Sequence, residues 1–141
     1  EQKNRILLAL TSNMSGQQSP QAVELTHQAI KAFQLSIKLA SSNFSREQDR
    51  DFIMKAVLST YECGDDDVQE ICMQCLKELA VQEYDSLPFY FNEVTALVGR
   101  AMVDENINEK VQAQAFEFWT MLTEEEIERS LSHTKECRGF I

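Results

Sequence analysis

Apolar side chains recur at helical spacing along most of the chain. In the middle, five of them fall at positions i, i+4, i+7, i+8 and i+11, which form one face of a helix; they are Val68, Cys72, Cys75, Leu76 and Leu79. A similar face precedes them, formed by Phe52, Ile53, Ala56, Val57 and Thr60. The sequence shows no alternation of β-branched and polar residues of the kind that marks a half-buried strand. The pattern predicts an all-helical fold.

Capping residues predict where the first helices begin. Ser19 can cap a helix with Pro20 at its first position, where the missing N–H costs nothing. Ser45 and Gln48 have the spacing of a capping box, which predicts a helix from residue 46 to the Cys63–Gly64 corner. Asp66 is the expected cap of the helix that follows this corner.

The same reasoning applies to the C-terminal half. Asp85 or Ser86 can cap a helix that holds Pro88 in its first turn. Two further capping boxes begin at Asn106 and Thr123. The predicted helices therefore cover residues 1–14, 20–41, 46–63, 67–80, 86–102, 107–123 and 124–131, with an aperiodic tail from residue 132.

The apolar face of residues 68–79 has counterparts on both sides. Forty-six residues upstream it falls on Ala22, Thr26, Ala29, Ile30 and Phe33. Forty-three residues downstream it falls on Val111, Ala115, Phe118, Trp119 and Leu122. Any amphipathic helix partly matches another, but that does not explain why both shifts have nearly the same length. Two helices per period of about forty residues are typical of an α-solenoid of the HEAT or armadillo type.

We therefore expect one all-α domain over residues 1–141, built from three antiparallel helix pairs. The predicted repeats are residues 1–42, 43–83 and 84–123, with an extension at 124–141. The chain begins in mid-pattern and without Met, which predicts a fragment of a longer solenoid.

The net charge of the chain indicates which classes of binding partner it can attract. The chain has 23 acidic and 13 basic residues, a formal net charge of −10. This balance repels nucleic-acid phosphates and anionic lipids, so basic proteins or uncharged apolar peptides are better candidates. No apolar run reaches the roughly 20 residues that cross a bilayer, so no membrane span is predicted.

The residues that could bind a metal or take part in catalysis are better explained by structural roles. Cys72 and Cys75 form a C-x-x-C pair on the apolar face of a helix, where buried thiols are commoner than zinc ligands. The acidic run 65–67 lacks the spacing of a calcium loop, and no phosphate-binding or nucleophile motif is present. We predict no enzyme activity, no metal and no cofactor.

Several short sequences resemble the importin-β (karyopherin-β) family of nuclear transport receptors in their order and separation. They are residues 1–7 (Glu-Gln-Lys-Asn-Arg-Ile-Leu), 50–54 (Arg-Asp-Phe-Ile-Met), 116–119 (Phe-Glu-Phe-Trp) and the acidic run 124–126. The resemblance covers nearly the whole chain and corresponds to about the fifth to seventh HEAT repeats of that family.

The resemblance implies a protein-binding module. In the family, grooves between outer helices accept the Phe side chains of Phe-Gly nucleoporins, and the matching positions here are Leu7, Leu8, Thr11, Asp49, Phe52 and Ile53. Thr11 replaces a larger aliphatic residue, which predicts a shallower groove. Phe52 and Ile53 are adjacent and therefore about 100° apart on a helix, so one can line the groove while the other packs inward.

The resemblance also implies further partners and a location. The full-length receptor would bind importin-α or cargo and Ran GTPase, and would occur in the cytoplasm, the nucleus and the nuclear pore. Ran is expected to contact this region little, and Glu117 to touch only the rim of the importin-α site. A second, weaker groove is predicted where residues 89–98 meet Met54 and Leu58. The alternative is a generic HEAT scaffold, of the phosphatase-scaffold or coat-adaptor type, without Phe-Gly binding.

Overall fold

The computed structural model describes residues 19–138, with side chains through residue 133. Every regular element in this range is a helix. The long helices are α2 (Pro20–Ser36), α4 (Glu47–Tyr61), α5 (Asp66–Gln82), α6 (Phe91–Val103) and α7 (Glu109–Arg138). Short helical turns join them: η1 (Ile37–Leu39), α3 (Ser41–Phe44) and η2 (Tyr84–Phe89). The helix predicted at residues 1–14 lies outside the described residues.

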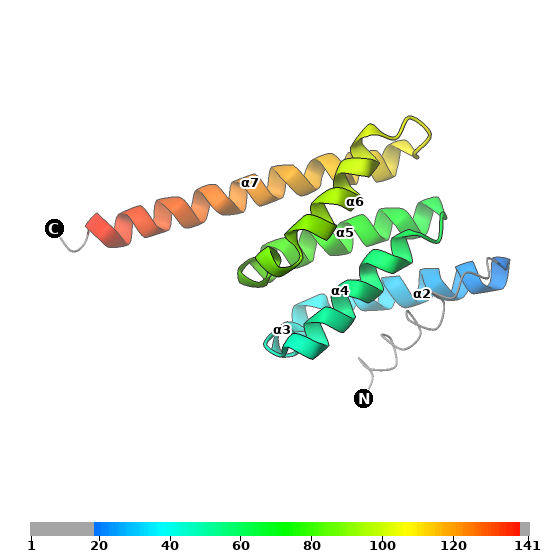
Figure 1. The fold of residues 1–141 in the computed structure, drawn as a ribbon, viewed down its shortest axis with the longest axis horizontal. Helices are drawn as coiled ribbons and strands as arrows, with labels where there is room; N and C mark the ends of the chain where they lie inside the picture. Colours follow the sequence, from blue (N-terminus) through cyan, green and yellow to red (C-terminus); the bar gives the residue numbers. More distant parts are fainter. Residues whose placement is uncertain (1–18, 139–141) are drawn as a thin grey trace.

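The helices form two layers (Figure 1). Helices α2, α5 and α7 run side by side in one layer, and α4 and α6 lie across them in the other. Helix α5 is central, since it packs against α2, α4 and α7. Successive pairs of antiparallel helices therefore stack along the chain. This arrangement confirms the predicted all-helical solenoid.

The repeated apolar face forms the core. Most of its members are buried in the three helices of the first layer: Thr26, Ala29, Ile30 and Phe33 in α2; Val68, Cys72, Cys75, Leu76 and Leu79 in α5; and Val111, Ala115 and Phe118 in α7. Burying a large apolar side chain stabilises the fold by about 1.5–3 kcal/mol relative to leaving it in water. Because each helix presents this face to its neighbours, the repetition in sequence becomes repetition in packing.

The cap at the start of α2 is confirmed. The backbone N–H of Ala22 donates to the Ser19 hydroxyl at 3.1 Å, and Pro20 occupies the first turn. This helix ends at Ser36 rather than near residue 41, because η1 and α3 turn the chain toward α4.

The caps predicted for α4 and α5 are each wrong by one residue. The Ser45 hydroxyl donates to the carbonyl of Ser42 instead of capping, and α4 begins after Arg46 without a side-chain cap. Helix α5 is capped by Asp65 rather than Asp66, because the Asp65 carboxylate accepts the N–H of Val68 at 3.0 Å. Gly64 lies between the two helices at φ 79°, a conformation that favours glycine. The predicted corner is therefore confirmed.

The start of α6 also differs from prediction. Residues 84–89 form the 3₁₀ turn η2, and α6 begins only at Phe91. Pro88 lies inside this turn and supplies no N–H to a helical ladder. This turn buries Leu87 between the second and third pairs. At α7 the cap is Asn108 rather than Asn106, since the Asn108 amide oxygen accepts the N–H of Lys110 at 2.9 Å.

The helix break predicted at Thr123 is absent. Helix α7 runs without interruption from Glu109 to Arg138, through the segment predicted as a tail from residue 132. The Thr123 hydroxyl donates to the carbonyl of Trp119 at 2.7 Å, one turn earlier in the same helix. With no Gly or Pro nearby, the capping-box pattern is simply part of a longer helix. None of the described helices combines the length and apolar character needed to cross a bilayer.

Candidate protein-binding surfaces

The structure describes half of the predicted Phe-Gly groove. Leu7, Leu8 and Thr11 lie outside the described residues, whereas Asp49, Phe52 and Ile53 all lie on α4. Asp49 is half-buried in the first turn of this helix and forms a long ion pair with Arg46, at 3.8 Å. A carboxylate at this place also stabilises the helix dipole.

Adjacent residues on α4 point in different directions. Ile53 is 1% exposed and belongs to the core, whereas Phe52 is 43% exposed. This division follows from the turn of about 100° between neighbouring helical residues. A ligand on the surface of α4 can therefore contact the Phe52 ring directly. The buried Ile53 side chain packs α4 against the core.

The second groove was predicted where residues 89–98 meet Met54 and Leu58, between α4 and α6. Met54 and Val94 are buried and line a void of only about 10 Å³, which is too small for an aromatic ring. Three contacts join α4 and its C-cap to η2, Tyr90 and α6. They are the Tyr90 hydroxyl with the Asp51 carboxylate, the Arg50 guanidinium 4.4 Å from the centre of the Phe89 ring, and Arg100 with Glu62 at 2.6 Å. Burial, together with the hydrogen bond to Asp51, raises the pKa of Tyr90 to about 12.

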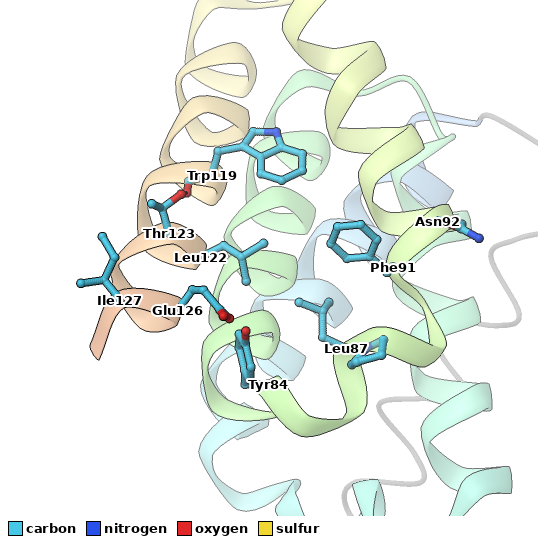
Figure 2. Close-up of a pocket in the computed structure, with 10 residues that line it drawn as sticks. Tyr84, Leu87, Phe91, Asn92, Trp119, Leu122, Thr123, Glu126 and Ile127 are labelled. Carbon is cyan, nitrogen blue, oxygen red and sulfur yellow. The ribbon is translucent and has the colours of Figure 1, made fainter. Parts of the chain in front are cut away.

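A larger cavity lies at the other side of the third helix pair. This open pocket has a volume of about 560 Å³ and is formed by η2 and the start of α6 on one side and α7 on the other. Figure 2 shows Phe91 facing Leu122 and Trp119 across it. Its lining is mostly apolar: Tyr84, Leu87, Pro88, Phe91, Asn92, Trp119, Leu122, Thr123, Glu126 and Ile127.

The walls of the open pocket are held by aromatic and ionic contacts. Trp119 packs edge-on against the buried ring of Phe118, with centroids 5.6 Å apart. Arg129 stacks over Tyr84 at 4.3 Å and also contacts Asp85 and Glu125, at 3.2 and 2.6 Å. These contacts fix η2 against α7. The pocket was not predicted from the sequence, although Trp119 and Leu122, the last residues of the repeated apolar face, were its best signal.

The buried cysteines are packing residues. Cys72 and Cys75 are free thiols in the core of α5, as predicted, and burial raises the pKa of both. Among the described residues, no three His, Cys, Asp or Glu side chains gather as metal ligands would. The open pocket and the outer face of α4 each expose apolar side chains, Phe91 and Ile127 in the pocket and Phe52 on α4.

The comparisons with known proteins point to one kind of protein. No protein-family model matches the chain. Importin subunit beta-1 of Schizosaccharomyces pombe is 34% identical over 131 residues, which are 92% of this chain and 15% of that protein. The same-named proteins of Arabidopsis thaliana and Saccharomyces cerevisiae are each 27% identical, over 91% and 89% of this chain and 14% of their own lengths.

The chain therefore spans about one seventh of the length of these curated relatives. The stacked helical pairs are the architecture that the resemblance predicted. Along about nine-tenths of its length the chain is thus similar to a segment of importin subunit beta-1, and its all-helical stack is consistent with that similarity.

Proposed function

We propose that this chain is a protein-binding module of a nuclear import receptor. The observation that carries the proposal is the similarity to importin subunit beta-1 in three species along about nine-tenths of the chain. In the longer receptor, importin-α or cargo and Ran GTPase would be the other partners. Such a receptor would move between the cytoplasm and the nucleus and would associate with the nuclear pore.

The proposed contact is between the outer face of α4 and Phe-Gly segments of nucleoporins. The half-exposed Phe52 ring offers an apolar surface for a nucleoporin Phe. Asp49, one turn earlier, offers a carboxylate to the backbone N–H groups of an extended peptide. By resemblance, Leu7, Leu8 and Thr11 would form the facing wall.

The affinity of a single contact of this kind is expected to be low. Burial of a Phe side chain is worth on the order of 1.5–3 kcal/mol, and association costs offset part of it. A transport receptor benefits from weak contacts that exchange rapidly. Several such contacts keep the receptor bound to the Phe-Gly repeats, while the rapid dissociation of each one lets it move among them. Single-site affinity is therefore expected to be low, and avidity to matter.

The test is a titration of the full 141-residue chain with a peptide carrying several Phe-Gly repeats. The informative variant is Phe52→Asp, and its matched control is Phe116→Asp, which alters an aromatic residue of similar exposure, 51%, on α7. We expect Phe52→Asp to weaken binding at least tenfold and Phe116→Asp to leave it unchanged. Circular dichroism of both variants verifies that the helices are retained.

Two outcomes would contradict the proposal. Equal loss of binding in both variants would mean that the peptide has no specific site on α4. Absence of binding by the unmodified chain would favour the generic HEAT scaffold, which needs no Phe-Gly site.

A further inference from the structure

Lys55 lies one turn after Phe52 on the surface of α4. Residues three apart on a helix are surface neighbours, with Cβ atoms about 5–6 Å from each other. Phe52 is 43% exposed, and Lys55 is exposed as well. A peptide whose aromatic ring rests on Phe52 therefore has the Lys55 ammonium within reach. Any ligand of this surface would meet a positive charge beside the ring.

The residue that would ordinarily pair with Lys55 is engaged elsewhere. Asp51 lies four residues before Lys55, the spacing at which a carboxylate and an ammonium on one helix attract each other. The Asp51 carboxylate instead accepts a hydrogen bond from the hydroxyl of Tyr90, directly before α6. Among residues 19–133, Lys55 forms no ion pair. The contact with Tyr90 thus leaves the Lys55 charge available to a ligand.

The positive charge of Lys55 is local. Asp49, the other charged residue of the proposed Phe-Gly surface, is paired with Arg46 and lies six residues before Lys55, about 9 Å along the helix axis. Salt screens charges over about 8 Å at physiological ionic strength. Although the whole chain has a net charge of −10, a peptide beside Lys55 therefore experiences mainly the ammonium.

We propose that Lys55, left available by the contact between Asp51 and Tyr90, makes α4 prefer Phe-Gly segments with an acidic residue two positions from the Phe. This inference rests on the proposed Phe-Gly function and adds a charge preference to it. In an extended peptide, side chains two residues apart point to the same side and lie about 6–7 Å apart. A peptide that runs along α4 with its Phe on Phe52 therefore places one such side chain over Lys55.

The two flanks of the peptide Phe are not equivalent. A carboxylate on the flank toward Lys55 gains an ion pair, whereas a carboxylate on the opposite flank lies toward Asp49 and gains none. An exposed ion pair changes affinity by at most about fivefold. The preference therefore adjusts a weak contact and keeps it rapidly exchanging.

The experiment titrates the full 141-residue chain with two sets of Phe-Gly peptides in about 50 mM salt. In one set, serine, glutamate or lysine lies two residues after the Phe, and in the other set it lies two residues before. We expect the glutamate peptide of one set to bind about threefold or more tighter than its lysine counterpart. This contrast between glutamate and lysine peptides should fade in about 0.5 M salt, because the charges are then screened.

Three variants test the origin of the contrast. Lys55→Glu should reverse it, so that the lysine peptide binds more tightly. Lys31→Glu is the matched control, because it makes the same charge change at an exposed position on α2, in the other layer, and it should preserve the contrast. Tyr90→Phe should reduce the contrast, since it frees Asp51 to pair with Lys55. Circular dichroism verifies that each variant keeps its helices.

Several results would overturn the proposal. They are equal affinities of the glutamate and lysine peptides in both sets, a contrast that Lys55→Glu or Tyr90→Phe leaves unchanged, and a contrast that Lys31→Glu abolishes. The serine peptide separates this proposal from the function on which it rests. If that peptide binds through Phe52 and no charge contrast is found, only the charge preference is refuted. If no peptide binds, both proposals are refuted.

Discussion

At the scale of single residues, one side-chain oxygen caps the start of α5 and another caps the start of α7. The Asp65 carboxylate accepts the N–H of Val68 at 3.0 Å, and the Asn108 amide oxygen accepts the N–H of Lys110 at 2.9 Å. The first N–H groups of a helix have no partner within it, so such an acceptor satisfies a group that would otherwise need water. Neighbouring acidic residues stabilise the helix dipole but make no such bond.

We predict that Asp65→Ala and Asp66→Ala differ in cost. Loss of the cap at Asp65 should lower the free energy of unfolding by about 1 kcal/mol. Loss of Asp66 should lower it by only a few tenths, the usual size of an exposed charge near a helix start. Urea unfolding followed by circular dichroism measures both. Asp65→Asn, which keeps an acceptor, is the control, and equal costs for the two alanine variants would contradict this assignment.

A second prediction concerns two tyrosines at high pH. Burial is the main cause that raises the pKa of Tyr61 and of Tyr90 from 10 to about 12. Below pH 10 both are neutral in the folded and the unfolded chain. Between pH 10 and 12 the unfolded chain loses these protons while the folded chain keeps them, so stability should fall as pH rises through this window.

The measurement is the urea midpoint at several pH values from 9 to 11.5, with tyrosine ionisation followed by absorbance. Tyr61→Phe and Tyr90→Phe should each reduce the fall, because phenylalanine does not titrate. A midpoint that stays constant, or a fall that neither substitution reduces, would show that these two hydroxyls are not responsible.

At the scale of elements, the continuity of α7 shapes the open pocket. Trp119 and Leu122 lie in its first half, whereas Glu126, Ile127 and Arg129 lie beyond the point where a break was predicted. Because the helix does not bend there, its second half continues along the pocket wall and lets Arg129 reach Tyr84 and Asp85. A break at Thr123 would have removed that wall.

We predict that Glu124→Pro distinguishes a continuous helix from a new one. Proline is tolerated at the first position of a helix but costs about 3 kcal/mol or more inside one. In the continuous α7, Glu124→Pro should therefore reduce helical circular dichroism and weaken the contact between Arg129 and η2. Glu124→Ala is the control. An unchanged spectrum for the proline variant would support two helices.

At the scale of the whole molecule, stability depends on α5. This helix packs against elements on three sides, α2, α4 and α7, so its apolar residues join all the described pairs. Polar contacts between neighbouring helices recur at the same spacing in the sequence. Gln34 donates to Gln74 at 3.0 Å, and forty-three residues later Lys77 donates to Glu117 at 2.7 Å. Such partly exposed polar contacts contribute modestly and chiefly fix the register of neighbouring pairs.

We predict that Leu76→Ala destabilises the whole described fold. Leu76 is fully buried between successive pairs, so the substitution loses transfer free energy and leaves a cavity, at a cost of about 2–5 kcal/mol. Leu35→Ala, at an exposed position on α2, should change stability by no more than about 0.5 kcal/mol. Urea unfolding compares them. Similar midpoints for the two variants would contradict the central role of α5.

The sequence by itself determined the helices, their apolar faces and the period of about forty residues. These features depend on the spacing of side chains along a helix, which is fixed by 3.6 residues per turn whatever the helix packs against. For that reason Ala29, Cys75 and Phe118 could be assigned to equivalent core positions. The Gly64 corner and the Ser19 cap were also readable, because both rest on local backbone chemistry.

Only the tertiary structure decided which of two adjacent residues caps a helix, which of two adjacent apolar side chains is exposed, and where cavities open. Asp65 and Asp66 look alike in sequence, and packing of the neighbouring helices selects one cap. Phe52 and Ile53 are both apolar, and only the position of the core separates an exposed ring from a buried side chain. The open pocket brings Tyr84 and Ile127 together across forty-three residues. Its shape depends on how far one helix pair fills the surface of another, which no local pattern encodes.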